Sequence, residues 1–138
     1  MDDTNIIIVD DSEDILSALK RELGDEHYDT LLAQSGDEAL QILSNVPCKI
    51  IISDVKMPVM DGFELLEKVK SLYPDMIRVV LSGHTDVKLV LEIVNERGID
   101  RYLTKPWNTV DLKSTINQCI ELYDLRMEVT KLRERLNN

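Results

Sequence analysis

Short apolar runs alternate along this chain with longer stretches in which apolar residues recur every three or four positions. The short runs have the length of buried strands, and the longer stretches have the period of amphipathic helices. The expected strands cover residues 5–9, 28–33, 49–53, 77–81 and 101–104. The expected helices begin near residues 12, 35, 62, 86 and 108. Five strand–helix units in alternation predict an α/β fold with a parallel sheet covered on both faces.

Caps and breakers indicate where these helices begin and end. Ser35 and Glu38 have the spacing of a capping box, which satisfies the free backbone N–H groups at a helix start. Gly24 and Gly98 follow the first and fourth helical patterns, and Pro47 follows the second. These residues predict that each of the three helices ends before the next strand begins.

The predicted sheet is doubly wound and flavodoxin-like. Right-handed crossovers between parallel strands favour this (βα)5 arrangement. In the strand order 2-1-3-4-5, strands one and three are central neighbours at the topological switch point. Ligands of such sheets bind outside the carboxyl ends of the strands. The residues that follow strands one and three are therefore the first candidates for a functional site.

Chemically useful side chains stand where the strands end. Asp10 and Asp11 follow the first strand, Asp54 follows the third, Ser82 the fourth and Lys105 the fifth. The second strand, which is an edge strand in the predicted order, ends without such a residue. The polar residues therefore favour the same strand order as the topology rules.

Three carboxylates at one edge of a sheet require a compensating charge. A hard dication such as Mg²⁺, which prefers carboxylate, carbonyl and water oxygens, supplies it. Asp54 is the central carboxylate and a candidate phosphoryl acceptor, because carboxylates form aspartyl phosphates. Lys105 and the Ser82 hydroxyl would then stabilise charge on the transferred group. For Asp10 and Asp11 alone, the alternative is an acidic pair favoured by a helix dipole.

Four segments together resemble the motifs of response-regulator receiver domains of two-component signalling: V-D-D, D-V-K-M-P-V-M-D-G, L-S-G-H and Y-L-T-K-P. The resemblance covers residues 5 to about 122, and no motif position is missing. It implies that Asp54 is phosphorylated by a sensor histidine kinase or a phosphotransfer protein. It also implies a regulatory module rather than an enzyme, although such a domain catalyses its own phosphoryl uptake and loss.

The resemblance further implies a set of metal ligands. Asp11, Asp54 and the backbone carbonyl of Lys56 would bind Mg²⁺, and Asp10 would act through water. Lys56 and His84 each lie two residues after a motif residue, at positions that resemble sites tuning the rate of phosphoryl loss. Simple solvated side chains remain the alternative for these two residues.

The resemblance also implies a switch. Lys105 and Ser82 would contact the phosphoryl group, and Tyr102 would be the aromatic residue that changes rotamer. Family members more often carry Thr in place of Ser82, and serine keeps the hydroxyl. The signal would pass through the face built from the fourth helix, the fifth strand and the fifth helix. Leu89 and Ile93, which lie off the core stripe of the fourth helix, would belong to that face.

Composition narrows the partners and the compartment. The 138-residue chain carries a net charge of −10 and contains no Lys/Arg-rich run, so we expect neither nucleic-acid nor membrane binding by this segment. It has no signal-peptide pattern and no apolar stretch that approaches a membrane span, so we expect the cytoplasm. Cys48 and Cys119 have no metal or redox spacing and are expected to be buried, reduced thiols.

The fifth helix is longer than a minimal receiver needs, and it meets no breaker before the chain ends. We expect a receiver over residues 1–122 and a helical extension over residues 123–138. In and beside the extension, apolar residues recur at a spacing of three and four, which is typical of a coiled-coil seam: Leu122, Leu125, Val129, Leu132 and Leu136. This spacing favours a parallel homodimer through the coiled coil that links to an absent output domain, and we expect the fourth and fifth helices to take part in the same dimer. A frayed, solvated helix is the alternative.

Two other functions use similar residues. A phosphatase of the haloacid-dehalogenase type also uses Asp, Lys and Mg²⁺. Such enzymes carry a D-x-D motif after the first strand, whereas this chain has Asp10-Asp11-Ser12, and it has no cap insertion for a substrate. A dimerisation module with an inactive site is the third alternative, and the intact acceptor set argues against it. Labelling of Asp54 by a small phosphodonor or beryllofluoride would favour the receiver, and turnover of phosphomonoesters would favour the phosphatase.

Overall fold

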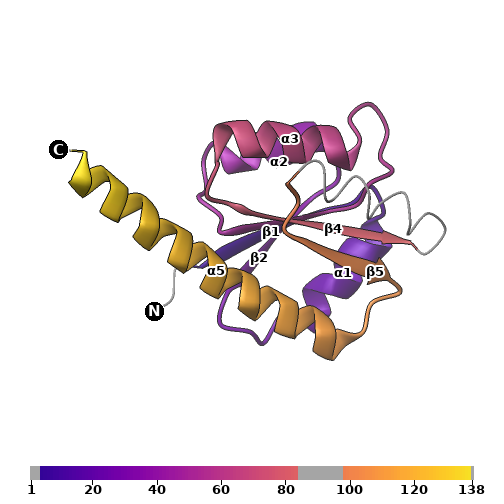
Figure 1. The fold of residues 1–138 in the computed structure, drawn as a ribbon. Helices are drawn as coiled ribbons and strands as arrows, with labels where there is room; N and C mark the ends of the chain where they lie inside the picture. The colour runs from indigo at the N-terminus through magenta and orange to yellow at the C-terminus, as the bar shows by residue number, and fades with distance from the viewer. Residues whose placement is uncertain (1–3, 84–97, 138) are drawn as a thin grey trace.

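The computed structural model describes residues 4–83 and 98–137 of the chain (Figure 1). The five strands are β1 (Asn5–Val9), β2 (Asp29–Ala33), β3 (Ile50–Ser53), β4 (Ile77–Gly83) and β5 (Arg101–Lys105). The helices are α1 (Glu13–Glu22), α2 (Gly36–Leu43), α3 (Gly62–Leu72) and α5 (Thr109–Leu136). The helix expected over residues 86–96, with Leu89 and Ile93, lies outside the described residues, as does His84.

The strands form one parallel sheet in the order β2-β1-β3-β4-β5. This confirms the predicted doubly wound α/β fold and its strand order. The register aligns Val9 with Ser53, so the residues that follow them, Asp10 and Asp54, emerge side by side at the carboxyl edge. The backbone N–H of Asp54 continues the ladder by donating to the Val9 carbonyl at 2.9 Å.

Helices cover both faces of the sheet, with α2 and α3 on one face and α1 and α5 on the other (Figure 1). Strand side chains alternate between the two layers: Ile7 and Ile51 pack toward α2 and α3, whereas Ile6 and Ile50 pack toward α1 and α5. All four are completely buried. Each such side chain stabilises the fold by roughly 1.5–3 kcal/mol. Burial on both faces explains why these strands read as unbroken apolar runs.

The strand ends differ from the prediction in one useful detail. β4 continues to Gly83 and β5 to Lys105, because Ser82 pairs with Thr104 and Gly83 pairs with Lys105. Ser82 and Lys105 are therefore held within paired strands rather than in the loops that follow. Backbone pairing fixes the height at which these two side chains leave the sheet.

Side-chain caps set the helix starts. Ser35 accepts the Glu38 N–H at 3.1 Å, as the capping box predicts, and the Glu38 carboxylate accepts the N–H of Gln34 at 3.2 Å. Asp61 caps α3 in the same way, and Asn108 caps α5. Because α3 and α5 follow β3 and β5 closely, these caps also fix the segments that carry the site.

Helix α5 has 28 residues, a length of roughly 42 Å. Its first half packs on the sheet through buried residues: Leu112, Ile116, Cys119 and Ile120. Its second half extends away from the sheet (Figure 1) and leaves exposed residues along one side: Leu125, Val129, Leu132 and Leu136. The long fifth helix is thus confirmed, while the coiled-coil dimer stays a prediction.

Polar contacts hold the middle of α5 against the sheet and its loops. The Arg126 guanidinium pairs with the Asp100 carboxylate at 2.5 Å, and the Thr130 hydroxyl lies 3.2 Å from an Asp75 carboxylate oxygen. The Lys49 ammonium pairs with the carboxylate of Asp124 at 2.9 Å. These contacts reach past the predicted boundary after residue 122.

Candidate phosphoacceptor and metal site

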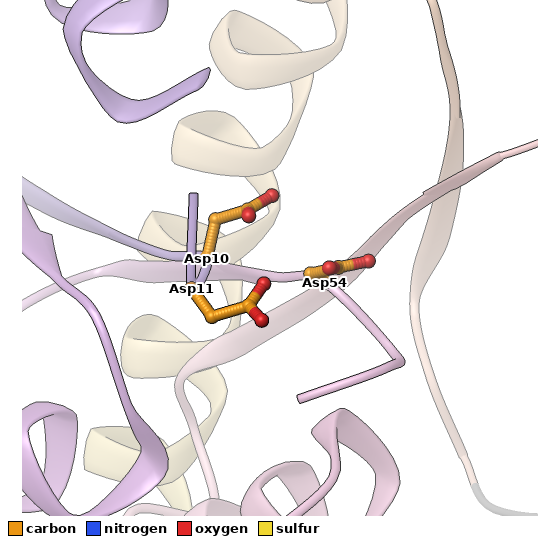
Figure 2. Close-up of side chains that lie close together, drawn as sticks. All are labelled: Asp10, Asp11 and Asp54. Carbon is orange, nitrogen blue, oxygen red and sulfur yellow. The ribbon is translucent and has the colours of Figure 1, made fainter. Parts of the chain in front are cut away.

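Three carboxylates meet at the carboxyl ends of β1 and β3 (Figure 2). Asp10, Asp11 and Asp54 each offer one oxygen, and these oxygens all lie within 4.8 Å of one another. The Asp10 side chain is almost fully buried and that of Asp54 is 14% exposed, whereas Asp11 is exposed. The cluster is therefore open to solvent on the Asp11 side and closed beneath Asp10.

Backbone contacts orient the Asp54 side chain. Its Oδ1 accepts the N–H of Val55 at 2.8 Å, and the Ser53 hydroxyl donates to the Asp54 carbonyl at 2.8 Å. The start of α3 lies directly against this turn, because a Cβ at Gly62 would come within 2.0 Å of the Asp54 carbonyl oxygen. Only glycine permits this approach, so Gly62 helps to fix the path of the acceptor loop.

Asp10 serves two partners. Its Oδ1 accepts the backbone N–H of Ser12 at 2.9 Å at the start of α1, and its Oδ2 pairs with the Lys105 ammonium at 2.6 Å. The alternative interpretation of Asp10 as a residue that supports a helix start is thus part of its role. The contact with Lys105, which lies 95 residues away in the chain, ties Asp10 to the site as well.

Lys105 stands between two carboxylates. Its ammonium lies 2.6 Å from Asp10 and 3.4 Å from Oδ1 of Asp54, and the side chain is only 18% exposed. The Lys105–Pro106 peptide bond that follows is cis. One ammonium against three carboxylates leaves an excess of negative charge if all three are ionised, and a divalent cation would balance it. The donor set therefore fits Mg²⁺.

Burial raises the pKa of the Asp54 carboxyl above its usual 3.8. The Lys105 ammonium lowers this pKa and the Asp10 carboxylate raises it, with the net effect upward. The protein therefore holds an ionised Asp54 at some expense of stability. A cation that pairs with the cluster relieves that expense, which favours its binding.

The other predicted site residues lie around this cluster. Ser82 is partly buried on β4, in the same paired strands as Lys105, and Lys56 is exposed in the loop between β3 and α3. Tyr102 on β5 packs against the core layer of α2 and α3. Its hydroxyl is buried and has no hydrogen-bond partner among the described residues. The roles expected of these three residues stay predictions.

Comparison with known proteins identifies the family. A family profile described as "Response regulator receiver domain" matches residues 6–117. This chain belongs to that family. A solved response-regulator receiver domain from Clostridium thermocellum is 32% identical, with a TM-score of 0.80 over 88% of this chain and 98% of the other. The receiver fold and its family are thus established together.

Two curated relatives are longer transcriptional regulators. The hydrogenase transcriptional regulatory protein HoxA of Cupriavidus necator is 36% identical over 92% of this chain and 26% of its own length. The C4-dicarboxylate transport transcriptional regulatory protein DctD of Rhizobium meliloti is 30% identical over 94% of this chain and 28% of its own. The receiver spans about a quarter of the length of these relatives.

One contact in this receiver carries no recognisable sequence signal. The carboxylate of Glu22, at the end of α1, accepts hydrogen bonds from the Trp107 indole and the Thr109 hydroxyl, in the segment that follows Lys105. Its partners lie 85 and 87 residues away, and no motif spacing links them. Only the folded chain brings Glu22 to this segment.

A cavity of about 340 Å³ lies at the other end of the sheet and contains none of the three carboxylates. It is bounded by the end of α2, the loop before β4 and the middle of α5, with Cys48, Met76, Tyr123 and Met127 among its lining residues.

Both cysteines are buried and free, as expected. Among the described helices, none is long and apolar enough to cross a bilayer.

Proposed function

We propose that this receiver accepts a phosphoryl group on Asp54, in the cytoplasm, from a sensor histidine kinase or a phosphotransfer protein. The observation that carries the proposal is the position of Asp54 beside one ammonium and two further carboxylates. A carboxylate held next to a fixed cation and a candidate dication site has what phosphoryl transfer requires, which is alignment and charge neutralisation.

In the proposed reaction, a carboxylate oxygen of Asp54 attacks the phosphorus atom of a phosphohistidine. The new P–O bond forms as the P–N bond to the imidazole breaks, and the freed imidazole takes a proton from solvent. Lys105 moves its ammonium from the carboxylates toward one phosphoryl oxygen, and the Ser82 hydroxyl donates to another. Hydrolysis of the resulting acyl phosphate returns Asp54 to its starting state.

Mg²⁺, when bound, supplies positive charge that offsets the cluster and the incoming phosphoryl oxygens. Asp11 and Asp54, with the backbone carbonyl of Lys56, would hold the cation directly, and Asp10 would act through water. Asp11 is suited to a direct role because it is the exposed member of the three. Asp10 is already committed to Ser12 and Lys105, which suits an indirect role.

The phosphoryl group then acts as a switch, because the acyl phosphate carries about −1.5 to −2 units of charge where the Asp54 carboxylate carried −1. Movement of Ser82 and Lys105 toward that charge changes the ends of β4 and β5, and Tyr102 responds by changing rotamer. Ser82 vacates space beside β4 that Tyr102 can enter, and no hydrogen bond to the Tyr102 hydroxyl among the described residues holds it in its present rotamer. The signal leaves through β5 and α5, together with the segment between β4 and β5.

Helix α5 carries the signal outward in this proposal. The carboxylate of Asp100, immediately before β5, accepts hydrogen bonds from the backbone N–H of Arg78 on β4 and from the Arg126 guanidinium on α5. A shift of β5 therefore acts directly on the middle of the helix. The exposed residues of the second half form a seam for a parallel homodimer, which would pass the change to an output domain beyond residue 138.

The seam is tested by charge at its centre. Leu125→Asp with Leu132→Asp should give a monomer in sedimentation experiments and should still accept phosphate. The control adds the same charge at exposed residues that lie off the seam, as Asn117→Asp on α5 with Asn137→Asp at its C-terminal cap, and should remain a dimer. A parent protein that is monomeric with and without beryllofluoride would refute the seam and leave the phosphoacceptor proposal standing.

The phosphoacceptor proposal is tested by adding a small phosphodonor such as acetyl phosphate and following the intact mass. We expect the parent to gain one phosphoryl group in Mg²⁺ and none in a metal chelator. Asp54→Asn should gain none under either condition. Turnover of many phosphomonoesters without stable labelling would instead identify a phosphatase.

A further inference from the structure

The Glu22 carboxylate uses both of its oxygens to hold the segment that follows Lys105. Its Oε2 accepts the Trp107 indole N–H, and its Oε1 accepts the Thr109 hydroxyl at 2.6 Å. Glu22 is the last residue of α1, and Thr109 is the first residue of α5. A single side chain thus links the end of one helix to the loop and the start of another.

This loop is short and is fixed at both of its ends. Lys105 closes β5 and pairs with Asp10, and the Asn108 side chain caps α5 by accepting the N–H of Asp111 at 3.0 Å. Trp107, between them, packs against the core layer formed with α1 and α5. Only three residues separate Lys105 from the helix, so a displacement of Trp107 reaches the Lys105 backbone directly.

We propose that Glu22 is a positioning residue for Lys105 in phosphoryl transfer. By holding Trp107 and Thr109 against α1, it keeps the Lys105 ammonium aligned with the Asp10 and Asp54 carboxylates. Alignment matters because displacements on the order of 1 Å can reduce a rate by about a hundredfold. This inference rests on the proposed function at Asp54, and its experiments separate the two.

The chemistry of the contact predicts which substitution preserves it. Glu22→Ala removes both acceptors. Glu22→Gln keeps both contacts, since its carbonyl accepts the Trp107 N–H and its amide donates to the Thr109 hydroxyl, which accepts as well as donates. The alanine variant should therefore lose the anchor and the glutamine variant should restore it, even though glutamine has no charge.

A neighbouring ion pair provides the matched control. Glu26 lies four residues after Glu22 and pairs with Lys113 of α5 at 3.6 Å, so it also joins the α1 side to α5. Among the described residues, Glu26 has no side-chain hydrogen bond or ion pair with the loop that follows Lys105. Glu26→Ala therefore removes a similar acidic side chain and a similar link while leaving the loop anchored.

The first experiment measures the rate of Asp54 labelling by acetyl phosphate in Mg²⁺ over a range of donor concentrations. We expect Glu22→Ala to lower the maximal rate by roughly tenfold with little change in the half-saturating donor concentration. Glu22→Gln should label at nearly the parental rate, and so should Glu26→Ala. A parental rate in Glu22→Ala, or a glutamine variant as slow as alanine, would overturn the inference.

The second experiment does not depend on phosphoryl transfer. Acylation of lysines by a reagent that attacks free amines, followed by peptide mass spectrometry, reports how far Lys105 is protected by its carboxylate partners. We expect Lys105 to react several-fold faster in Glu22→Ala than in the parent, Glu22→Gln or Glu26→Ala. Trp107, the single tryptophan of the chain, should also shift its emission to longer wavelength in the alanine variant alone.

The two experiments distinguish a failure of the phosphoacceptor proposal from a failure of the positioning role of Glu22. If the parent never acquires a label but Lys105 protection and Trp107 emission change as expected, the phosphoacceptor proposal fails and the anchoring role of Glu22 stands. If the parent is labelled but Lys105 protection is the same in all four proteins, the positioning role of Glu22 is wrong.

Discussion

Replacing Asp54 with asparagine should stabilise the metal-free protein at neutral pH. Asparagine keeps the size of the side chain and an oxygen to accept the Val55 N–H, which lies 2.8 Å from Oδ1. Lys105 is not left unpaired, because it stays 2.6 Å from the Asp10 carboxylate. The substitution therefore removes a charge without removing a packed group.

The size of the effect follows from opposing interactions. The attraction between Lys105 and Asp54 at 3.4 Å is roughly 1 kcal/mol in water and roughly 5 kcal/mol at an effective dielectric constant of about 20. Burial of Asp54 and repulsion from Asp10 act against it, and the raised pKa of Asp54 shows that the opposing effects prevail. We expect Asp54→Asn to raise the free energy of unfolding by about 1 kcal/mol, which raises Tm by roughly 2–4 °C in a chain of this size.

The pH dependence of the stability difference between Asp54→Asn and the parent tests the direction of this effect a second time. Because the folded-state pKa of Asp54 is raised, its ionised form destabilises the fold at neutral pH. That penalty shrinks as the pH falls through the folded-state pKa and disappears below the usual value of 3.8, where the carboxyl is protonated in both states. The advantage of Asp54→Asn over the parent should therefore shrink on acidification.

Urea unfolding of both proteins in a metal chelator, over a range of pH, measures this advantage. Adding Mg²⁺ should favour the parent, because a ligand at about 100 times its Kd adds roughly 2.7 kcal/mol to stability and the variant has lost a carboxylate. An Asp54→Asn protein that is less stable than the parent at neutral pH without metal would show that the attraction of Lys105 dominates, and would refute the reasoning.

Three further predictions concern the surroundings of the site. Asp11→Ala should weaken Mg²⁺ binding at least tenfold by isothermal titration, while Asp14→Ala, an exposed carboxylate outside the cluster, should have little effect. Gly62→Ala should destabilise the fold by roughly 1–3 kcal/mol in chemical unfolding, and Gly83→Ala, whose Cβ would meet nothing within 4 Å, should change stability little. Both cysteines should resist iodoacetamide at neutral pH until the protein is unfolded, because burial raises each thiol pKa to about 11.

The fold and the centre of the site were predictable because each has a local signal. Apolar runs that end on Asp10, Asp54 and Lys105 identify strands and the edge at which their side chains meet. Right-handed crossovers then limit the strand order. The polar residues at the strand ends and the strand order together predict that the three carboxylates meet.

Other features depend on contacts between distant residues. The pairing of Ser82 with Thr104 extends β4 beyond its apolar run. The sequence did not predict this extension, because Ser82 and Gly83 are not apolar. Arg126 and Asp100 are 26 residues apart in the chain, and they meet only because the first half of α5 packs on the sheet. The exposed face of the second half of α5 was visible in the sequence, but the contacts that set its orientation were not.

The most direct test of the account locates the phosphoryl group. The parent is labelled with acetyl phosphate in Mg²⁺ and reduced with borohydride, which converts an aspartyl phosphate to homoserine, and the peptides are then sequenced by mass spectrometry. We predict modification at Asp54 alone, and only when Mg²⁺ is present. Modification at Asp10 or Asp11, or an equal yield at Asp54 in a metal chelator, would contradict the account.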